Sequence, residues 1–239
     1  MSKDWTKTRA KVKDFIESEI YPKETELAKG TPEAREMLGS LMQLAKDEKI
    51  WALGHPEDIG GGGMPFMEYV YVNEVIGRSS FAMVALGTHS LQDSIMLREF
   101  ASPHWRDQYL EPLVQGEIFP SFGMTEPDVA SSDPTQLQTT AILDNGTWKI
   151  NGTKWFTTGA ARAAYTTVMC RTELDAPSHG AFSMIIVPTD NPGYKIVRET
   201  PVLGINGGHY EVKYDNVEVP EENLLGPRGQ GFIIAQKRL

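Results

Sequence analysis

The chain has 239 residues, of which 40% are hydrophobic and 23% charged, the composition of a globular protein with one large domain or two modest ones. Its formal net charge of −9 argues against a nucleic-acid partner, because a phosphate backbone favours a basic protein surface. No apolar run approaches the roughly 18 to 20 residues that a membrane span requires, so none is predicted.

The first part of the sequence, to about residue 117, has the spacing of helices. Apolar residues recur at helical intervals near the start, until Pro22 interrupts them. Thr31, followed by a proline and a glutamate, is typical of a helix start. The glycine-rich segment 54–63 is interpreted as a connection between helices, and the apolar segment 81–100 predicts one long buried helix.

From Ile118 onward the pattern predicts strands and tight turns. Asn145-Gly146 and Asn151-Gly152 are both strong hairpin signals, because Asn and Gly tolerate the positive φ of such turns. Further strand patterns cover residues 165–170, 182–187, 194–197 and 210–214. The predicted fold class is α+β, with an all-α helical domain over 1–117, a β-barrel-like middle domain over 118–229 and the start of a C-terminal helix over 230–239.

Cys170 is the only cysteine, which excludes a disulfide within the chain and a thiolate metal cluster. The histidines have no metal-ligand spacing, so no metal site is expected. The first residues lack the pattern of a signal or transit peptide. We therefore expect a cytoplasmic protein in a reducing compartment.

Three segments are candidates for functional motifs. Residues 122–133 join the end of a predicted strand to a loop crowded with hydroxyls and acids, and such loops collect binding groups. Lys154 to Ala160 forms a second segment, which by itself is equally well explained as a strand that ends in a turn. The third comprises residues 214–220 and 223–226.

Together, these segments resemble the acyl-CoA dehydrogenase family. The first is similar to the family's flavin-binding signature, an aromatic residue, two further residues, Thr-Glu-Pro and a Ser-Asp ending. The second resembles its Trp-x-Thr stretch, and the third its exit from the β domain. The form Asp-Val-Ala-Ser-Ser-Asp over 128–133 most resembles a branch associated with longer acyl chains. The resemblance covers essentially the whole sequence in order.

The resemblance implies FAD as the cofactor, with seven binding residues: Phe122, Met124, Thr125, Ser132, Trp155, Phe156 and Thr157. Trp155 would pack against the flavin face and Thr157 would hydrogen-bond near N5. Thr125 and the backbone around Met124 would donate at the pyrimidine edge, where negative charge develops. Ser132 would contact the diphosphate region or the acyl-CoA substrate.

The resemblance also implies the reaction, which is α,β-dehydrogenation of a fatty acyl-CoA to the trans-2-enoyl-CoA. An electron-transfer flavoprotein is the implied acceptor, and the full-length protein would be a homodimer or homotetramer. No catalytic residue is assigned, because the family's glutamate base is expected beyond Leu239 in a C-terminal helical domain. Glu126 is interpreted as a structural group that binds backbone amides.

One departure from the family pattern concerns the substrate. Many members have an orienting arginine where this sequence has His209 and its neighbours. Two alternative functions also remain open. One is an acyl-CoA oxidase or flavin monooxygenase relative, in which reduced flavin reacts with oxygen. The other is a non-catalytic truncated paralogue that binds FAD, acyl-CoA or another subunit.

Overall fold

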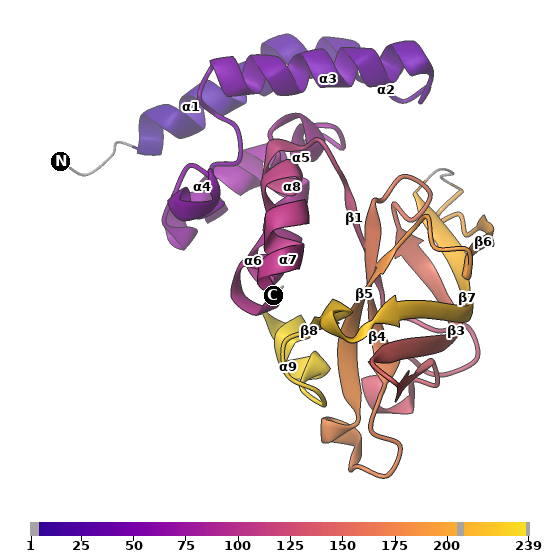
Figure 1. Ribbon diagram of the computed structural model, residues 1–239. Coiled ribbons are helices and arrows are strands. Elements are labelled where there is room, and N and C mark those ends of the chain that lie inside the picture. Colours follow the sequence, from indigo (N-terminus) through magenta and orange to yellow (C-terminus); the bar gives the residue numbers. More distant parts are fainter. Residues whose placement is uncertain (1–4, 205–207, 238–239) are drawn as a thin grey trace. The chain divides into compact units, whose positions relative to one another are not determined.

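The computed structural model describes residues 5–204 and 208–237, which divide into two compact units (Figure 1). The first unit is helical, runs to Ser94 and includes Val114–Gly116. The second unit comprises Ile95–Leu113 and the described residues from Glu117 onward, and it contains the sheet. Helices followed by a mixed sheet confirm the predicted α+β class. The second unit begins at Ile95, which is earlier in the chain than the change in sequence pattern near residue 117.

The first unit packs short helices around one apolar core. Its elements are α1 (Trp5–Phe15), η1 (Ile16–Ile20), η2 (Tyr21–Lys23), α2 (Glu24–Leu27), α3 (Pro32–Asp47), η3 (Glu57–Ile59), α4 (Phe66–Ile76), α5 (Ala82–Ala85) and η4 (Thr88–Ser90). Helix α3 begins as predicted, because the Thr31 hydroxyl accepts a hydrogen bond from the Ala34 amide at 3.3 Å. The core is formed by apolar side chains from α1, α3 and α4, among others.

The prediction of one helix over 81–100 is wrong. Helix α5 ends at Ala85, and after the turn η4 a new helix, α6 (Leu91–Phe100), begins. Gly87 lies between them with φ of 70°, and a Cβ there would lie 2.6 Å from the Trp51 ring. A largely apolar segment was therefore predicted as one helix, although the chain breaks at Gly87, where a close contact with a distant tryptophan leaves no room for a side chain.

The second unit begins with helices and continues into an eight-stranded mixed sheet. Its helical elements are α6 from Ile95 onward, α7 (Pro103–Trp105), η5 (Arg106–Leu110), the first part of α8 (Glu111–Gln115) and, at the end, α9 (Gly231–Gln236). The longer strands are β1 (Pro120–Gly123), β2 (Thr140–Asp144), β3 (Thr147–Thr158), β4 (Tyr165–Arg171), β5 (Phe182–Pro188), β6 (Tyr194–Glu199) and β7 (His209–Pro220), followed by the short β8 (Leu224–Leu225). The strand order is β6-β7-β3-β2-β4-β5-β8, and β1 pairs with β4 in parallel.

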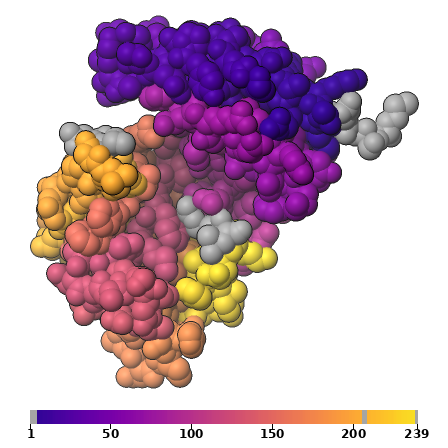
Figure 2. Space-filling model, turned by 180° about the vertical axis from the view of Figure 1, so that it is seen from behind, coloured from indigo at the N-terminus to yellow at the C-terminus, as the bar shows by residue number. Residues whose placement is uncertain are grey.

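Strands β4 and β5 are buried on both faces. Alternate side chains such as Val168 and Ile185 join one core with residues of β3, β6 and β7, so the sheet wraps around its own interior. The intervening side chains, such as Met169 and Met184, join a second core with α6, α7 and α9. Part of α9 lies at the surface, where Ile233 is 60% exposed. Figure 2 shows the yellow C-terminal segment at the surface of the molecule.

The two hairpin predictions had different outcomes. Asn145-Gly146 forms the turn between β2 and β3, with positive φ at both residues, as predicted. Asn151-Gly152 is not a turn, because β3 continues through both residues with a register irregularity against β7. The Asn151 side chain accepts from the Asn216 amide at 2.8 Å, and a Cβ on Gly152 would lie 2.4 Å from Thr139 Oγ1.

Among the described residues, no helix has the length and apolar character needed to cross a lipid bilayer.

Candidate functional site

The structure brings the first two singled-out segments together in the second unit. The backbone amide of Trp155, on β3, donates to the Thr125 carbonyl in the loop after β1 at 2.9 Å. Residues separated by about thirty positions in the sequence therefore form one surface. Phe122 lies on β1 itself, so six of the seven predicted cofactor-binding residues lie at or beside this junction, and they are Phe122, Met124, Thr125, Trp155, Phe156 and Thr157.

A bulge in β3 shapes this junction. Lys154 pairs with Val212 and Thr157 with Tyr210, so β3 has one residue more than β7 between these pairs. Phe156 has a φ of 49° within the bulge. Because paired residues face the same side of a sheet, the extra residue turns Thr157 to the face that Lys154 also occupies.

Two buried polar atoms at the bulge have no hydrogen-bond partner within the described part of the chain. They are Trp155 Nε1 and Thr157 Oγ1. The Phe156 ring lies 4.6 Å from the Trp155 ring, and its side chain is 41% exposed. Buried polar groups are ordinarily paired, so these atoms fit a ligand that presents both a flat face and polar edges. A flavin has these properties, and the residues present fit it.

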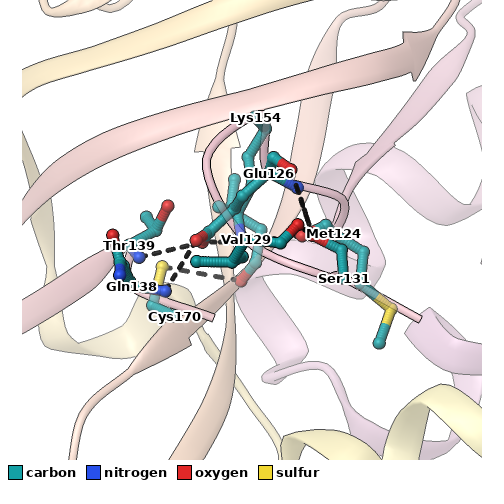
Figure 3. Close-up of polar contacts among 9 residues, drawn as sticks. Met124, Glu126, Val129, Ser131, Gln138, Thr139, Lys154 and Cys170 are labelled. Carbon is teal, nitrogen blue, oxygen red and sulfur yellow. Dashed lines mark hydrogen bonds and ion pairs between the residues drawn. The ribbon is translucent and has the colours of Figure 1, made fainter. Parts of the chain in front are cut away.

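Lys154 and Glu126, the sequence neighbours of Trp155 and Thr125, form a buried ion pair (Figure 3). The Lys154 ammonium donates to Glu126 Oε1 at 2.8 Å and to the Met124 carbonyl at 2.9 Å. The Glu126 carboxylate also accepts from the backbone amides of Gln138 at 2.6 Å and Thr139 at 2.8 Å. The interpretation of Glu126 as a structural group that binds backbone amides is confirmed. Its buried lysine partner was not predicted, although Lys154 stands in the second segment.

The electrostatics of this pair follow from its burial. Burial alone would raise the pKa of Glu126, but the Lys154 charge and the hydrogen bonds outweigh it and hold this pKa below its usual range. Burial lowers the pKa of Lys154, and the Glu126 charge opposes that effect. The neighbouring Cys170 thiol stays neutral, because burial raises its pKa to about 12. This thiol is therefore inert, as expected from its position in an apolar strand.

Ser132 lies away from these contacts, exposed on the loop. Its neighbour Ser131 organises the loop instead, because its hydroxyl accepts from the Glu126 amide at 2.8 Å and donates to the Glu126 carbonyl at 3.1 Å. Two adjacent serines gave no sequence signal of which one would turn inward. The exposed position leaves Ser132 available for a ligand.

A cavity of about 170 Å³ opens beside the same loop. It is lined by Asp133, Pro134, Thr135, Met169, Ser178, His179, Phe182 and Phe232. The Thr135 hydroxyl donates to Asp133 at 2.6 Å, and hydrogen bonds from Thr135 and Gln136 lower the pKa of this carboxyl. Apart from the loop that ends at Asp133, sequence reasoning did not identify these residues, because they come from distant elements.

His209 lies in the region where the resemblance to the acyl-CoA dehydrogenase family leads us to expect an arginine. Its Nδ1 atom forms a hydrogen bond of 2.9 Å with the hydroxyl of Thr158, the last residue of β3. His209 is therefore engaged with the strand that carries the bulge.

Two family models match successive parts of the chain, and the boundary between them lies near residue 117, later in the chain than Ser94, where the continuous part of the first compact unit ends. Residues 2–117 match the acyl-CoA dehydrogenase N-terminal domain, and residues 121–217 match the acyl-CoA dehydrogenase middle domain. The chain belongs to the acyl-CoA dehydrogenase family, whose members are oxidoreductases and flavoproteins.

Individual relatives agree with this assignment. The chain is 39% identical to a Mycobacterium tuberculosis protein named probable acyl-CoA dehydrogenase FadE2, over 97% of this chain and 60% of that protein. A solved structure from Mycobacterium abscessus, assigned to the acyl-CoA dehydrogenases, is 33% identical with a TM-score of 0.91, over 100% of this chain and 64% of that one. A Mycobacterium smegmatis glutaryl-CoA dehydrogenase solved with FADH2 shares the fold at 23% identity and a TM-score of 0.79, over 100% of this chain and 59% of that one. The chain thus spans about three-fifths of the length of these relatives.

Proposed function

We propose that this protein takes part in the FAD-dependent α,β-dehydrogenation of a fatty acyl-CoA to its trans-2-enoyl-CoA. The observation that carries the proposal is the junction at Thr125 and Trp155, where two buried polar atoms, Trp155 Nε1 and Thr157 Oγ1, lack partners among the described residues. Membership of the family supplies the reaction class.

The residues at the bulge would hold the flavin. Trp155, with the Phe156 ring beside it, offers an aromatic platform, and the Thr157 hydroxyl has no hydrogen-bond partner within the described ranges. Thr125 and the Met124 backbone would face the pyrimidine edge, and Phe122 completes the set on β1. When bound, FAD would supply the acceptor for the hydride that leaves the substrate.

The cavity beside the loop is the site that we propose for part of the acyl-CoA. Its lining combines apolar side chains, among them Phe182 and Phe232, with the polar Thr135, Ser178 and His179, which suits a ligand that has an apolar chain and polar groups. Ser132 is exposed on the same loop and would contact this ligand or the diphosphate region of FAD.

Glu126 is unsuited to the role of base. Its two oxygens are occupied by Lys154 and by two backbone amides, and its pKa is lowered. A base must reach the carbon next to the thioester and accept its proton. The proposal therefore keeps the expected glutamate beyond Leu239, outside the described residues, as the base.

Three further features remain predictions. They are an electron-transfer flavoprotein as acceptor, a homodimeric or homotetrameric assembly, and a cytoplasmic location. The first two are properties that family resemblance implies. The location is an expectation from the sequence alone.

The test of the proposal is a titration of the purified protein with FAD, followed by flavin absorbance and tryptophan fluorescence. Trp155→Ala should weaken FAD binding at least about tenfold while circular dichroism stays unchanged, because a large aromatic contact is lost. Trp155→Phe is the matched control and should retain most of the affinity, since it keeps a ring in place. Equal affinity in wild type and Trp155→Ala would contradict the platform role.

A further inference from the structure

The buried lysine contacts the junction at one particular peptide unit. Lys154 Nζ donates to the Met124 carbonyl at 2.9 Å, and that carbonyl belongs to the same peptide group as the Thr125 N–H. On the other side of this residue, the Thr125 carbonyl accepts from Trp155 at 2.9 Å. Within the described chain, the Thr125 N–H itself has no hydrogen-bond partner.

A charged donor on a carbonyl polarises the whole peptide group. Electron density moves toward the oxygen, so the N–H at the other end becomes a stronger donor, and the effect grows where water is excluded. The Lys154 side chain is 0% exposed, and its pair partner Glu126 is 5% exposed. The Glu126 charge is shared with the amides of Gln138 and Thr139, so it does not fully cancel the ammonium at the Met124 carbonyl.

We propose that Lys154 is a positioning residue that raises the reduction potential of bound FAD by polarising the Met124–Thr125 peptide. This inference rests on the proposed function, in which the Thr125 amide faces the flavin pyrimidine edge. Reduction adds negative charge to the flavin, so a stronger donor at that edge favours the reduced form over the oxidised form.

A purely structural role for Lys154 has a different signature. The ion pair also fixes the loop, so its loss would weaken FAD binding through disorder. Disorder weakens the binding of both oxidation states equally and leaves the potential unchanged. Lost polarisation weakens the binding of reduced flavin more than that of oxidised flavin, and the ratio of these affinities sets the potential.

The experiment compares Lys154→Met with Lys149→Met in the FAD-loaded protein. Lys149 lies on the same strand, and its pair with Asp144 is exposed, so its variant is matched in chemistry but not in burial. The potential is measured by equilibration with a redox dye. For Lys154→Met we expect about a tenfold smaller equilibrium constant for two-electron reduction, which corresponds to about 30 mV. Lys149→Met should leave the reduction potential unchanged. An unchanged potential in Lys154→Met, with or without weaker FAD binding, would overturn the inference.

A double variant covers the case in which Lys154→Met does not fold. Lys154→Met combined with Glu126→Gln leaves no buried carboxylate without a counter-charge. Relative to the single variant Glu126→Gln, this double variant should show the same fall in the reduction potential, about 30 mV. A potential equal to that of the single variant Glu126→Gln would contradict the inference.

A second measurement needs no flavin. The dipeptide Met-Thr occurs once in the sequence, so carbonyl-13C methionine with 15N threonine gives a single NMR signal for the Thr125 amide. Removal of the Lys154 charge should move its proton upfield, because the amide becomes a weaker donor. An unmoved signal in a folded variant would refute polarisation. Absence of FAD binding by wild type would instead refute the proposed function, while this signal still tests the effect of Lys154.

Discussion

Strand β3 carries two lysine–carboxylate pairs of nearly the same length in very different surroundings. Lys149 lies 2.9 Å from Asp144, with side chains 40% and 50% exposed, whereas Lys154 lies 2.8 Å from Glu126 with 0% and 5% exposed. The exposed pair is screened by water and is local to one hairpin. The buried pair joins β3 to the loop after β1 and, through the Glu126 carboxylate, to the backbone just before β2. Burial, rather than distance, therefore decides what an ion pair does in this molecule.

The largest expected effect is on stability. Lys154→Met leaves the Glu126 carboxylate buried without its counter-charge, so we expect a loss of about 3–5 kcal/mol in the free energy of unfolding. The double variant with Glu126→Gln should lose less, because no buried charge remains. Denaturant unfolding followed by tryptophan fluorescence gives both values. Equal losses in the single and double variants would show that packing, not charge, dominates.

An intermediate effect concerns pH. In wild type the pKa of Glu126 is lowered in the fold, so its stabilising contribution is present above the ordinary glutamate pKa and is lost as the pH falls through the lowered value. In Lys154→Met only burial and the amide hydrogen bonds remain to act on Glu126, so its pKa should rise, and protonation should relieve the buried charge. The stability difference between the two proteins should therefore shrink from pH 7 toward pH 4. A constant difference over that range would contradict the ion-pair account.

The smallest effect is expected at the exposed pair. Lys149→Met should change the free energy of unfolding by at most about 1 kcal/mol, and added salt should diminish the change further. Denaturant curves at low and high salt provide the measurement. A loss comparable with that of Lys154→Met would remove the distinction between the two pairs.

Much of the fold was predictable because it depends on local pattern. The helix start at Thr31 and the hairpin at Asn145-Gly146 use residues whose backbone preferences act within a few positions. The break at Gly87 and the irregularity at Gly152 were missed, since each depends on a contact with a distant side chain, Trp51 or Thr139.

The candidate site likewise has parts that the sequence predicted and parts that it did not. The two segments around Thr125 and Trp155 were identified from their sequence, and the structure brings them together through a backbone hydrogen bond. The pairing of Lys154 with Glu126 depends on tertiary packing, which a linear pattern does not encode. The hydroxyl of Ser131 bonds within its own loop, but the sequence does not distinguish this serine from its neighbour Ser132. The cavity lining, drawn from four separate parts of the second unit, was unpredictable for the same reason.

The burial of β4 and β5 on both faces matters for folding while the chain is being synthesised. One face of β5 is covered partly by α9, through Ile234 and Ala235, which emerge from the ribosome only after the sheet is complete. Until then, the run from Phe182 to Val187 is a nearly continuous β-prone apolar segment that lacks one of its covers. A nascent chain that pauses before Gly231 would therefore depend on chaperones to keep this segment from pairing with other chains.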